Sequence, residues 1–178
     1  MKWVFKSGTI ILGIIEKLRR CIMAVELTAE QKFRLHHFKE MASLIRAYKE
    51  AFGEAAYQVA VKHSGEKAFA EWKEIADLRE SNTIQDLIEL LWKPLQKEGF
   101  EFTISETNEG VHATCTKCAL HDLAQYLGIT EEGFYMFCES DPYIVEGFNP
   151  NIGLKRTKTL MQGHECCDFF YYRKEAYE

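Results

Sequence analysis

Apolar residues recur at helical spacing through the first half of the chain. After the capping-box pattern Thr28-Ala-Glu-Gln31, apolar positions from Phe33 to Phe52 repeat every three to five residues along one helical face. The same spacing continues further on, with a break expected near Ser64-Gly65 and a new start at Thr83. The pattern predicts successive helices over about residues 28–53, 54–62, 66–78 and 83–94.

From Phe100 onward the pattern changes to the alternation that is typical of strands. Asn108-Glu-Gly110 and Gln162-Gly163-His164 supply two turns, and Gly128 is the expected end of a helix. The predicted elements are a hairpin of 100–105 with 111–117, helices at 118–127, 130–138 and from 140, and a hairpin of 152–161 with 166–173. We therefore expect an α+β fold, in which N-terminal helices pack on a C-terminal antiparallel sheet of about four strands, two hairpins interrupted by two short helices.

The length and composition are those of an ordinary globular protein. The chain has 178 residues, of which 47% are hydrophobic and 28% are charged. We expect one domain over residues 23–178, with a helical half at 28–98 and a sheet half at 100–174. The formal net charge is −5, whereas nucleic-acid binders usually carry a concentrated basic face. The composition therefore argues against nucleic acid as a partner and leaves a small anionic ligand open.

Residues 1–22 differ from the rest, because they carry five basic side chains and a single acidic one, Glu16. The apolar run Thr9–Ile15 is too short to cross a bilayer, which needs about 20 apolar residues, and no small-residue cleavage site follows it. We interpret residues 1–22 as a basic amphipathic leader helix that covers the domain, and membrane contact is the minority interpretation. Without an export signal, we expect a cytoplasmic protein with reduced thiols.

Six Cys and six His are more than packing needs in a chain of this size. In a reducing compartment, clustered Cys indicate metal binding or chemistry rather than disulfides. Four of these residues, Cys21, His36, His37 and His63, fall in helical or leader segments and are most simply surface or packing residues. The remaining eight gather in the sheet half: His112, Cys115, Cys118, His121, Cys138, His164, Cys166 and Cys167.

Cys115-Thr-Lys-Cys118 lies where a strand passes into a helix, with His121 one turn later. That spacing suits zinc, although a second Cys pair of the kind found in zinc ribbons is absent. The adjacent residues Cys166 and Cys167 must face opposite sides of a strand. In a regular strand, His164, Cys166 and Asp168 would share one face. Any one of these thiols taken alone could equally be a small buried hydrophobic residue.

Several motifs of the sheet half resemble the L-2-amino-thiazoline-4-carboxylic acid hydrolase family. They are Cys118, Cys138, Glu146-Gly-Phe-Asn-Pro150, Arg156-Thr-Lys-Thr-Leu160 and Gly163-His-Glu-Cys-Cys-Asp-Phe169. The resemblance covers about residues 28–174, and the last motif is its most specific part. It implies hydrolytic opening of a cyclic, amidine-like thiazoline to an N-carbamoyl-cysteine. The family pattern falls on Cys118, Cys138, Gly163, Cys167, Asp168 and Phe169, whereas His164 stands where an acidic residue is more usual.

Two mechanisms fit these residues. In the first, Cys118, Cys138 and Cys167 bind zinc, or iron, and leave a fourth position for a water whose pKa the metal lowers, while Asp168 or His164 transfers protons. In the second, Cys167 is a thiolate nucleophile and a His activates it. The three-Cys arrangement is favoured, because three separated thiols are hard to explain by packing alone.

The same region also contains residues that could bind a substrate or a partner. Arg156 and Lys158 could bind a substrate carboxylate, although a solvated sheet face would have the same residues. The rival hypothesis is a non-catalytic, sensor-like module that binds a small molecule or a metal with the same cysteines. A partner could also contact Tyr171-Tyr172 or the leader. In each case the principal partner is a small molecule, and a homo-oligomer stays open.

Overall fold

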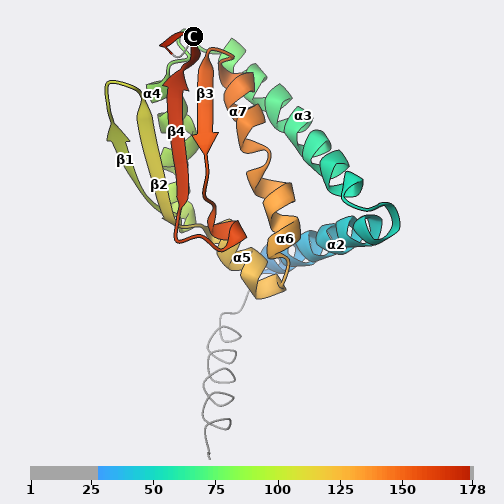
Figure 1. Ribbon diagram of the computed structural model, residues 1–178. Helices are drawn as coiled ribbons and strands as arrows, with labels where there is room; N and C mark the ends of the chain where they lie inside the picture. The colour runs from blue at the N-terminus through green and yellow to red at the C-terminus, as the bar shows by residue number, and fades with distance from the viewer. Residues whose placement is uncertain (1–27, 177–178) are drawn as a thin grey trace, which may run out of the picture. The chain divides into compact units, whose positions relative to one another are not determined.

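The computed structural model describes residues 28–176 (Figure 1). Its helices are α2 (Ala29–Phe52), α3 (Ala55–Asp77), α4 (Ile84–Leu95), α5 (Ala119–Leu127), α6 (Thr130–Gly133) and α7 (Asp141–Phe148). Its strands are β1 (Glu101–Glu106), β2 (Val111–Lys117), β3 (Ile152–Arg156) and β4 (Cys167–Arg173). Short helical turns occur at η1 (Gln96–Glu98), η2 (Phe134–Cys138), η3 (Leu160–Gln162) and η4 (Lys174–Ala176).

The chain divides into two compact units, residues 1–38 and 39–178, with the boundary inside α2. The leader predicted at 1–22 lies outside the described residues. Among the residues that are described, no helix is long and apolar enough to span a membrane. The packing and chemistry discussed below all belong to the second unit.

The predicted α+β class is confirmed, because helices come first and a four-stranded antiparallel sheet follows. The strand order is β1-β2-β4-β3, so the two predicted hairpins meet through β2 and β4. Alternation sets the faces of β2: Val111, Ala113 and Cys115 are buried, whereas His112 and Thr116 are exposed. One face of the sheet therefore carries the core.

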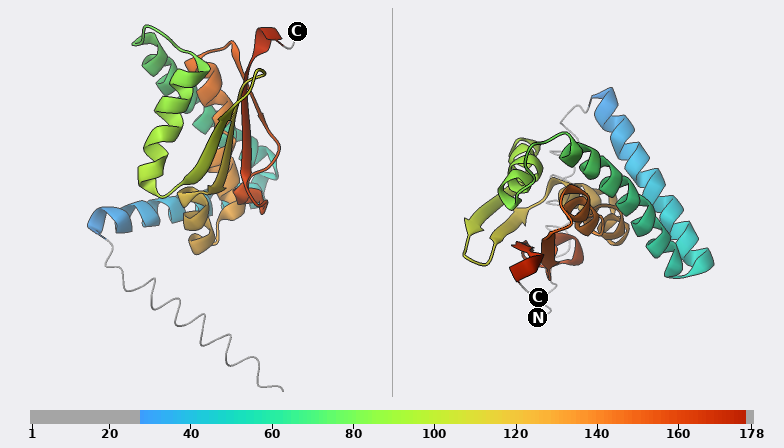
Figure 2. Two further views of the ribbon diagram at one scale, coloured as in Figure 1. Left: turned by 90° about the vertical axis from the view of Figure 1, so that its left-hand side faces the viewer. Right: turned by 90° about the horizontal axis from the view of Figure 1, so that it is seen from above.

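Helix α4 covers that core face of the sheet (Figure 2, left). It begins after Thr83, where a helix start was predicted, with a capping box in which Thr83 and Asp86 exchange hydrogen bonds between side chain and backbone. Leu87 and Trp92 are buried against the strands, and the Trp92 Nε1–H donates to the buried Tyr171 hydroxyl at 3.0 Å. That bond satisfies both polar groups within an otherwise apolar layer.

Helix α3 is continuous, so the break predicted near Ser64-Gly65 is wrong. The Ser64 hydroxyl donates back to the Ala60 carbonyl at 3.0 Å, so the serine is satisfied without interrupting the helix. Gly65 is there for packing, because a Cβ at this position would lie 2.5 Å from the ring of Tyr143 on α7. The glycine permits close contact between α3 and α7 rather than ending the helix.

The second hairpin is shorter than predicted. β3 ends at Arg156, the turn η3 follows, and β4 starts only at Cys167. The Asp168 carboxylate accepts the backbone N–H groups of Thr157 at 2.8 Å and Lys158 at 2.5 Å, which directs the chain after β3 out of the regular ladder. His164 consequently lies outside the strand, and the face that it was expected to share with Cys166 and Asp168 is not formed.

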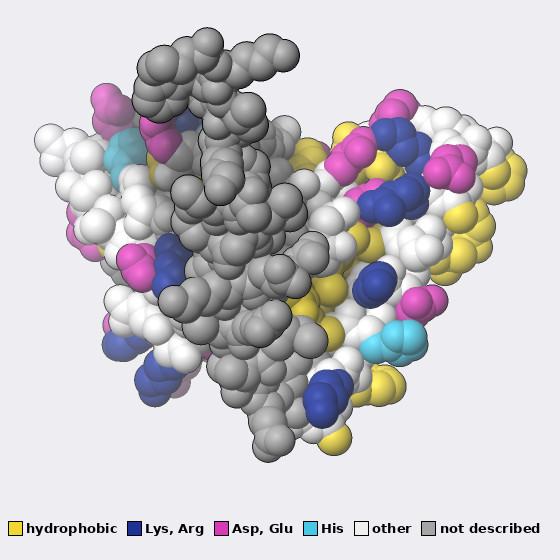
Figure 3. Space-filling model, turned by 90° about the horizontal axis from the view of Figure 1, so that it is seen from below, with side chains coloured by type: hydrophobic (Ala, Val, Ile, Leu, Met, Phe, Trp, Pro, Cys, Tyr) yellow, Lys and Arg dark blue, Asp and Glu magenta, His cyan; other side chains and the backbone are white. Residues whose placement is uncertain are grey.

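Part of α2 has an apolar strip that is exposed. Ala42 on one side of the helix is fully buried, whereas Met41, Leu44, Tyr48 and Phe52 are between 39% and 72% exposed. Figure 3 shows hydrophobic side chains lying among charged ones on the face seen from below. The oligomeric state stays a prediction.

The close packing of α7 on α3 generates a stability prediction. A Cβ at Gly147 would overlap the backbone carbonyl of Phe69, so Gly147→Ala should lower the free energy of unfolding by about 1–3 kcal/mol. Urea unfolding followed by circular dichroism measures the change. The neighbouring exposed residue supplies the control, because Glu146→Ala should change stability by less than about 0.5 kcal/mol. Equal stability of the two variants would contradict the packing account.

Candidate functional site

A cavity of about 220 Å³ lies between the core face of the sheet and the helices. Its walls are mostly aliphatic and aromatic, and among the described lining residues Asp141 is the one charged side chain. The lining residues are Leu91, Trp92, Leu95, Phe100, Cys115, Cys118, Leu120, Phe137, Cys138, Asp141, Ile144, Met161, Cys167 and Phe169. All three cysteines predicted as site residues, Cys118, Cys138 and Cys167, line this one cavity, and Cys115 joins them.

Different elements bring the four thiols together. Cys115 and Cys167 are directly opposite each other in the register of β2 and β4. Cys118 is the N-cap of α5, three residues after Cys115, where the strand passes into the helix. Cys138 ends η2, a π-helical turn that follows α6 directly. The arrangement therefore depends on the sheet register and on two helix ends, none of which the Cys spacing alone specifies.

Cys167 is the one thiol of these four whose pKa is lowered. Its sulfur accepts the backbone N–H of Leu160 at 3.2 Å. The interaction with Cys115, together with the Leu160 N–H and the charge of Arg156, lowers the pKa of Cys167 to about 7, although burial opposes the change. The same interaction and burial raise the pKa of Cys115, whose thiol donates to the Lys117 carbonyl oxygen at 3.1 Å. Of the two, Cys167 is therefore the thiol that is favoured as a thiolate.

The other two thiols stay protonated, because burial raises the pKa of both Cys118 and Cys138. For a shared zinc, three or more ligands must surround one point. In the described part of the chain, no group of three or more His, Cys, Asp or Glu side chains is placed to hold a metal ion. Zinc or iron at Cys118, Cys138 and Cys167 stays a prediction.

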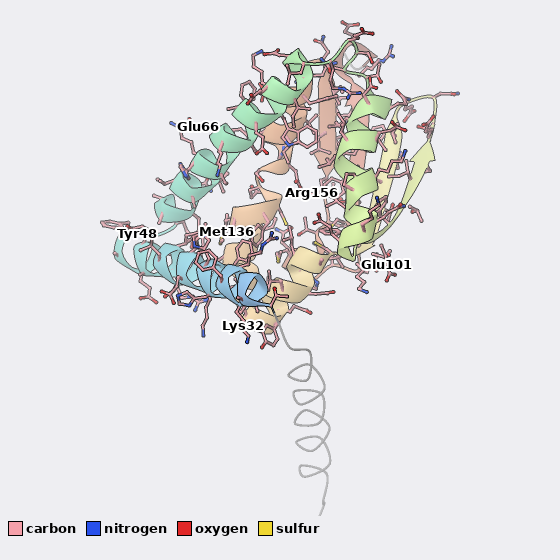
Figure 4. All side chains as sticks on the ribbon, turned by 180° about the vertical axis from the view of Figure 1, so that it is seen from behind. Lys32, Tyr48, Glu66, Glu101, Met136 and Arg156 are labelled. Carbon is pink, nitrogen blue, oxygen red and sulfur yellow. The ribbon has the colours of Figure 1, made fainter. Side chains whose placement is uncertain are left out.

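Asp141 and Arg156 form an ion pair at the cavity wall, and sequence reasoning missed the aspartate. Arg156 Nη1 donates to the Asp141 carboxylate and to the carbonyl oxygen of Cys138 at 2.8 Å, while Nη2 lies 3.3 Å from Glu139 Oε1. Figure 4 shows Arg156 in the interior, among side chains between helices and sheet. Burial raises the pKa of Asp141 to about 7, against the opposing attraction of Arg156. In the sequence, Asp141 is marked only by its place directly before Pro142, a pattern that indicates the start of a helix.

Three other predicted site residues do not line the cavity. The Asp168 carboxylate accepts hydrogen bonds from Thr157 and Lys158, and these bonds hold its pKa below the usual value although burial opposes them. The Lys158 ammonium pairs with Glu165 at 3.0 Å. His164 is exposed in the turn before β4. Asp168 and Lys158 hold the second hairpin together, and the functional roles predicted for all three stay predictions.

The remaining candidates are dispersed. His121 lies 3.8 Å from Asp122 and lines a separate hollow beside α6 and η3. His112 stacks on Phe170 on the outer face of the sheet. Cys166 lies just before β4, is half-buried and does not line the cavity. Cys21 lies outside the described residues.

Comparisons with known proteins found a matching family model and a solved structure of similar fold. The family model described as L-2-amino-thiazoline-4-carboxylic acid hydrolase matches residues 31–171. A crystal structure of the phenol-responsive sensory domain of the transcription activator PoxR, with phenol, has a similar fold, with a TM-score of 0.50 at 11% sequence identity. That similarity covers 79% of this chain and 76% of the sensory domain. No curated protein matches the sequence.

The ion pair at the cavity wall generates a second prediction. Arg156→Gln leaves the Asp141 carboxylate without its partner, so the free energy of unfolding should fall by about 2–4 kcal/mol. Lys158→Gln is the matched control, because the partner of Lys158, Glu165, is exposed and this ion pair should contribute little to the free energy of unfolding. Thermal and urea unfolding of both variants measure the difference. A stability loss in Lys158→Gln as large as in Arg156→Gln would contradict this assignment.

Proposed function

Because the chain belongs to the L-2-amino-thiazoline-4-carboxylic acid hydrolase family, we propose that it opens a small, amidine-like ring by hydrolysis in the thiol-lined cavity. One observation carries the proposal: the Cys167 sulfur, which accepts the Leu160 N–H, and the Asp141 carboxyl group line the same apolar cavity. A nucleophile and a proton donor in one water-poor space are what ring opening requires.

The chemistry uses Cys167 as the nucleophile. Its thiolate attacks the ring carbon that lies between sulfur and nitrogen, and the Leu160 N–H stabilises the sulfur before attack. The ring carbon–sulfur bond then breaks, and Asp141 delivers a proton to the departing sulfur. The opened chain stays attached to Cys167 as an S-linked amidine. Water adds to that carbon, and the Cys167 thiolate leaves to give a carbamoyl product and free enzyme.

The cavity lining also limits the substrate. The described residues that line the cavity include no cation that could bind a carboxylate. Arg156 lies beside the cavity, but it is already paired with Asp141 and Glu139. Burying an unpaired carboxylate is costly. An amidine, in contrast, can donate its N–H groups to the Asp141 carboxylate. We therefore expect an uncharged or cationic ring to be preferred over a ring that bears a carboxylate within the cavity.

Turnover of 2-amino-2-thiazoline and of its 4-carboxylate, followed through the new thiol of the product, tests this function. Cys167→Ser should lower kcat/KM at least about 10³-fold, whereas Cys166→Ser should leave it unchanged, since Cys166 does not line the cavity. Intact-mass analysis of the wild type after rapid quenching should find an adduct with the mass of one substrate. Neither ring being opened, or turnover surviving in Cys167→Ser, would reject the proposal.

A second candidate, binding of a small apolar ring without catalysis, is favoured by the aromatic and aliphatic lining. An engineered cavity of about 150 Å³ holds benzene in another protein, so 220 Å³ is enough for one substituted ring. The fold likeness to a phenol-responsive sensory domain supports the same ligand class. In this case the thiols would form part of the binding surface and Asp141 would accept a hydrogen bond from the ligand.

Thermal shifts with phenol and benzoate test this second candidate, because the two ligands have the same ring and differ in charge. Phenol at about one hundred times its Kd should stabilise the protein by about 2.7 kcal/mol and raise Tm by about 5–10 °C. Benzoate should give no shift, since its carboxylate would face Asp141 without a cation. Equal shifts with the two ligands, or none with phenol, would contradict binding in this cavity.

A further inference from the structure

The geometry points to a reversible oxidation site at Cys115 and Cys167. A peroxide converts the two thiols into a cross-strand disulfide, and the Cys167 sulfur is then no longer available to react in the cavity. The inference begins with the register. Cys115 and Cys167 are paired directly across β2 and β4, and they form the last pair of that ladder. Both side chains are on the core face, because both line the same cavity.

The separation of the two residues suits a disulfide. Directly opposite residues in an antiparallel pair have Cβ atoms about 4.5–5.5 Å apart, and a disulfide requires about 3.5–4.5 Å. The two ranges meet at about 4.5 Å. The remaining approach is small, and β4 begins at Cys167, so the backbone before it is free of the β2 ladder.

Competing pairings are less favourable. Cys166 is the neighbour of Cys167 in sequence, but it lies just before β4 and does not line the cavity. Cys118 and Cys138 line the cavity from helix ends. In the described part of the chain, Cys115 is the one cysteine that lies directly opposite Cys167 in the sheet register. Oxidation of Cys167 should therefore be resolved by Cys115.

The reaction balances with peroxide as the oxidant. The Cys167 sulfur attacks one peroxide oxygen, the O–O bond breaks, and the products are a sulfenic acid and water. The Cys115 sulfur then displaces the hydroxyl group, which forms the S–S bond and releases a second water. Overall, two thiols and one hydrogen peroxide give one disulfide and two waters. Both residues are buried, at 2% and 7% exposure, so the oxidant must reach them through the cavity.

Oxidation would have a functional consequence, and this consequence alone rests on the proposed function. A disulfide removes the Cys167 nucleophile, so ring opening should stop in the oxidised protein and return after reduction. If the cavity only binds a ligand, the disulfide would still form and turnover would be absent in both states. Chemical formation of the bond and its effect on activity are therefore separate readouts.

Peptide mapping tests the site. The full-length, reduced protein is treated with hydrogen peroxide, alkylated and digested with trypsin, which places Cys115 in the peptide 98–117 and Cys167 in the peptide 159–173. The expected result is a cross-link between these peptides that dithiothreitol reverses. It should persist in Cys166→Ser, which assigns the bond to Cys167, and disappear in Cys115→Ser, where Cys167 should instead accumulate sulfenic and sulfinic acid.

Three results would overturn the inference. They are a cross-link that is lost in Cys166→Ser, a link from Cys167 to the peptide 118–155 that carries Cys118 and Cys138, and full alkylation of Cys115 after peroxide treatment. Circular dichroism of each variant checks that it is folded before oxidation. Failure of ring opening in the reduced wild type would reject the proposed hydrolase without affecting this result, because the cross-link is detected by mass.

Discussion

The pairing of β2 with β4 is the constraint on which the cavity and the core both depend. In the observed register, Cys167, Phe169 and Tyr171 face α4, and Cys115 lies opposite Cys167. A slip of one residue would turn all of them to the outer face, because side chains alternate along a strand. The hydrogen bond between Trp92 and Tyr171 would be lost with the thiol pair. The stability of the sheet and the chemistry of the cavity are therefore set by the same interaction.

The cavity combines an apolar space with a few polar groups held at its wall. Arg156 holds one end of this wall, because it reaches η2 through the Cys138 carbonyl and α7 through Asp141. Without that cation, the aspartate would be a charge in a largely apolar environment, which is costly. Ring opening and ring binding, the two functions proposed for this cavity, would both use its small apolar space and the polar groups at one side.

Local sequence signals predicted most elements and part of the site. The helix start at Thr83, the first hairpin and the helix end at Gly128 depend on neighbouring residues, so they were predicted correctly. The break at Ser64-Gly65 was wrong because a tertiary contact, the Tyr143 ring, explains the glycine. Asp141 was missed because its partner is 15 residues away, on β3, and no local pattern marks that pairing.

By itself, the sequence determined the α+β class, the family and the concentration of cysteines in the sheet half, because these follow from periodicity, spacing and motif. Only the tertiary structure decided which cysteines meet. Cys115, Cys118, Cys138 and Cys167 line one cavity, whereas Cys166 does not. The physical reason is that the direction of a side chain depends on sheet register and helix ends, and these are set by contacts between segments far apart in the chain.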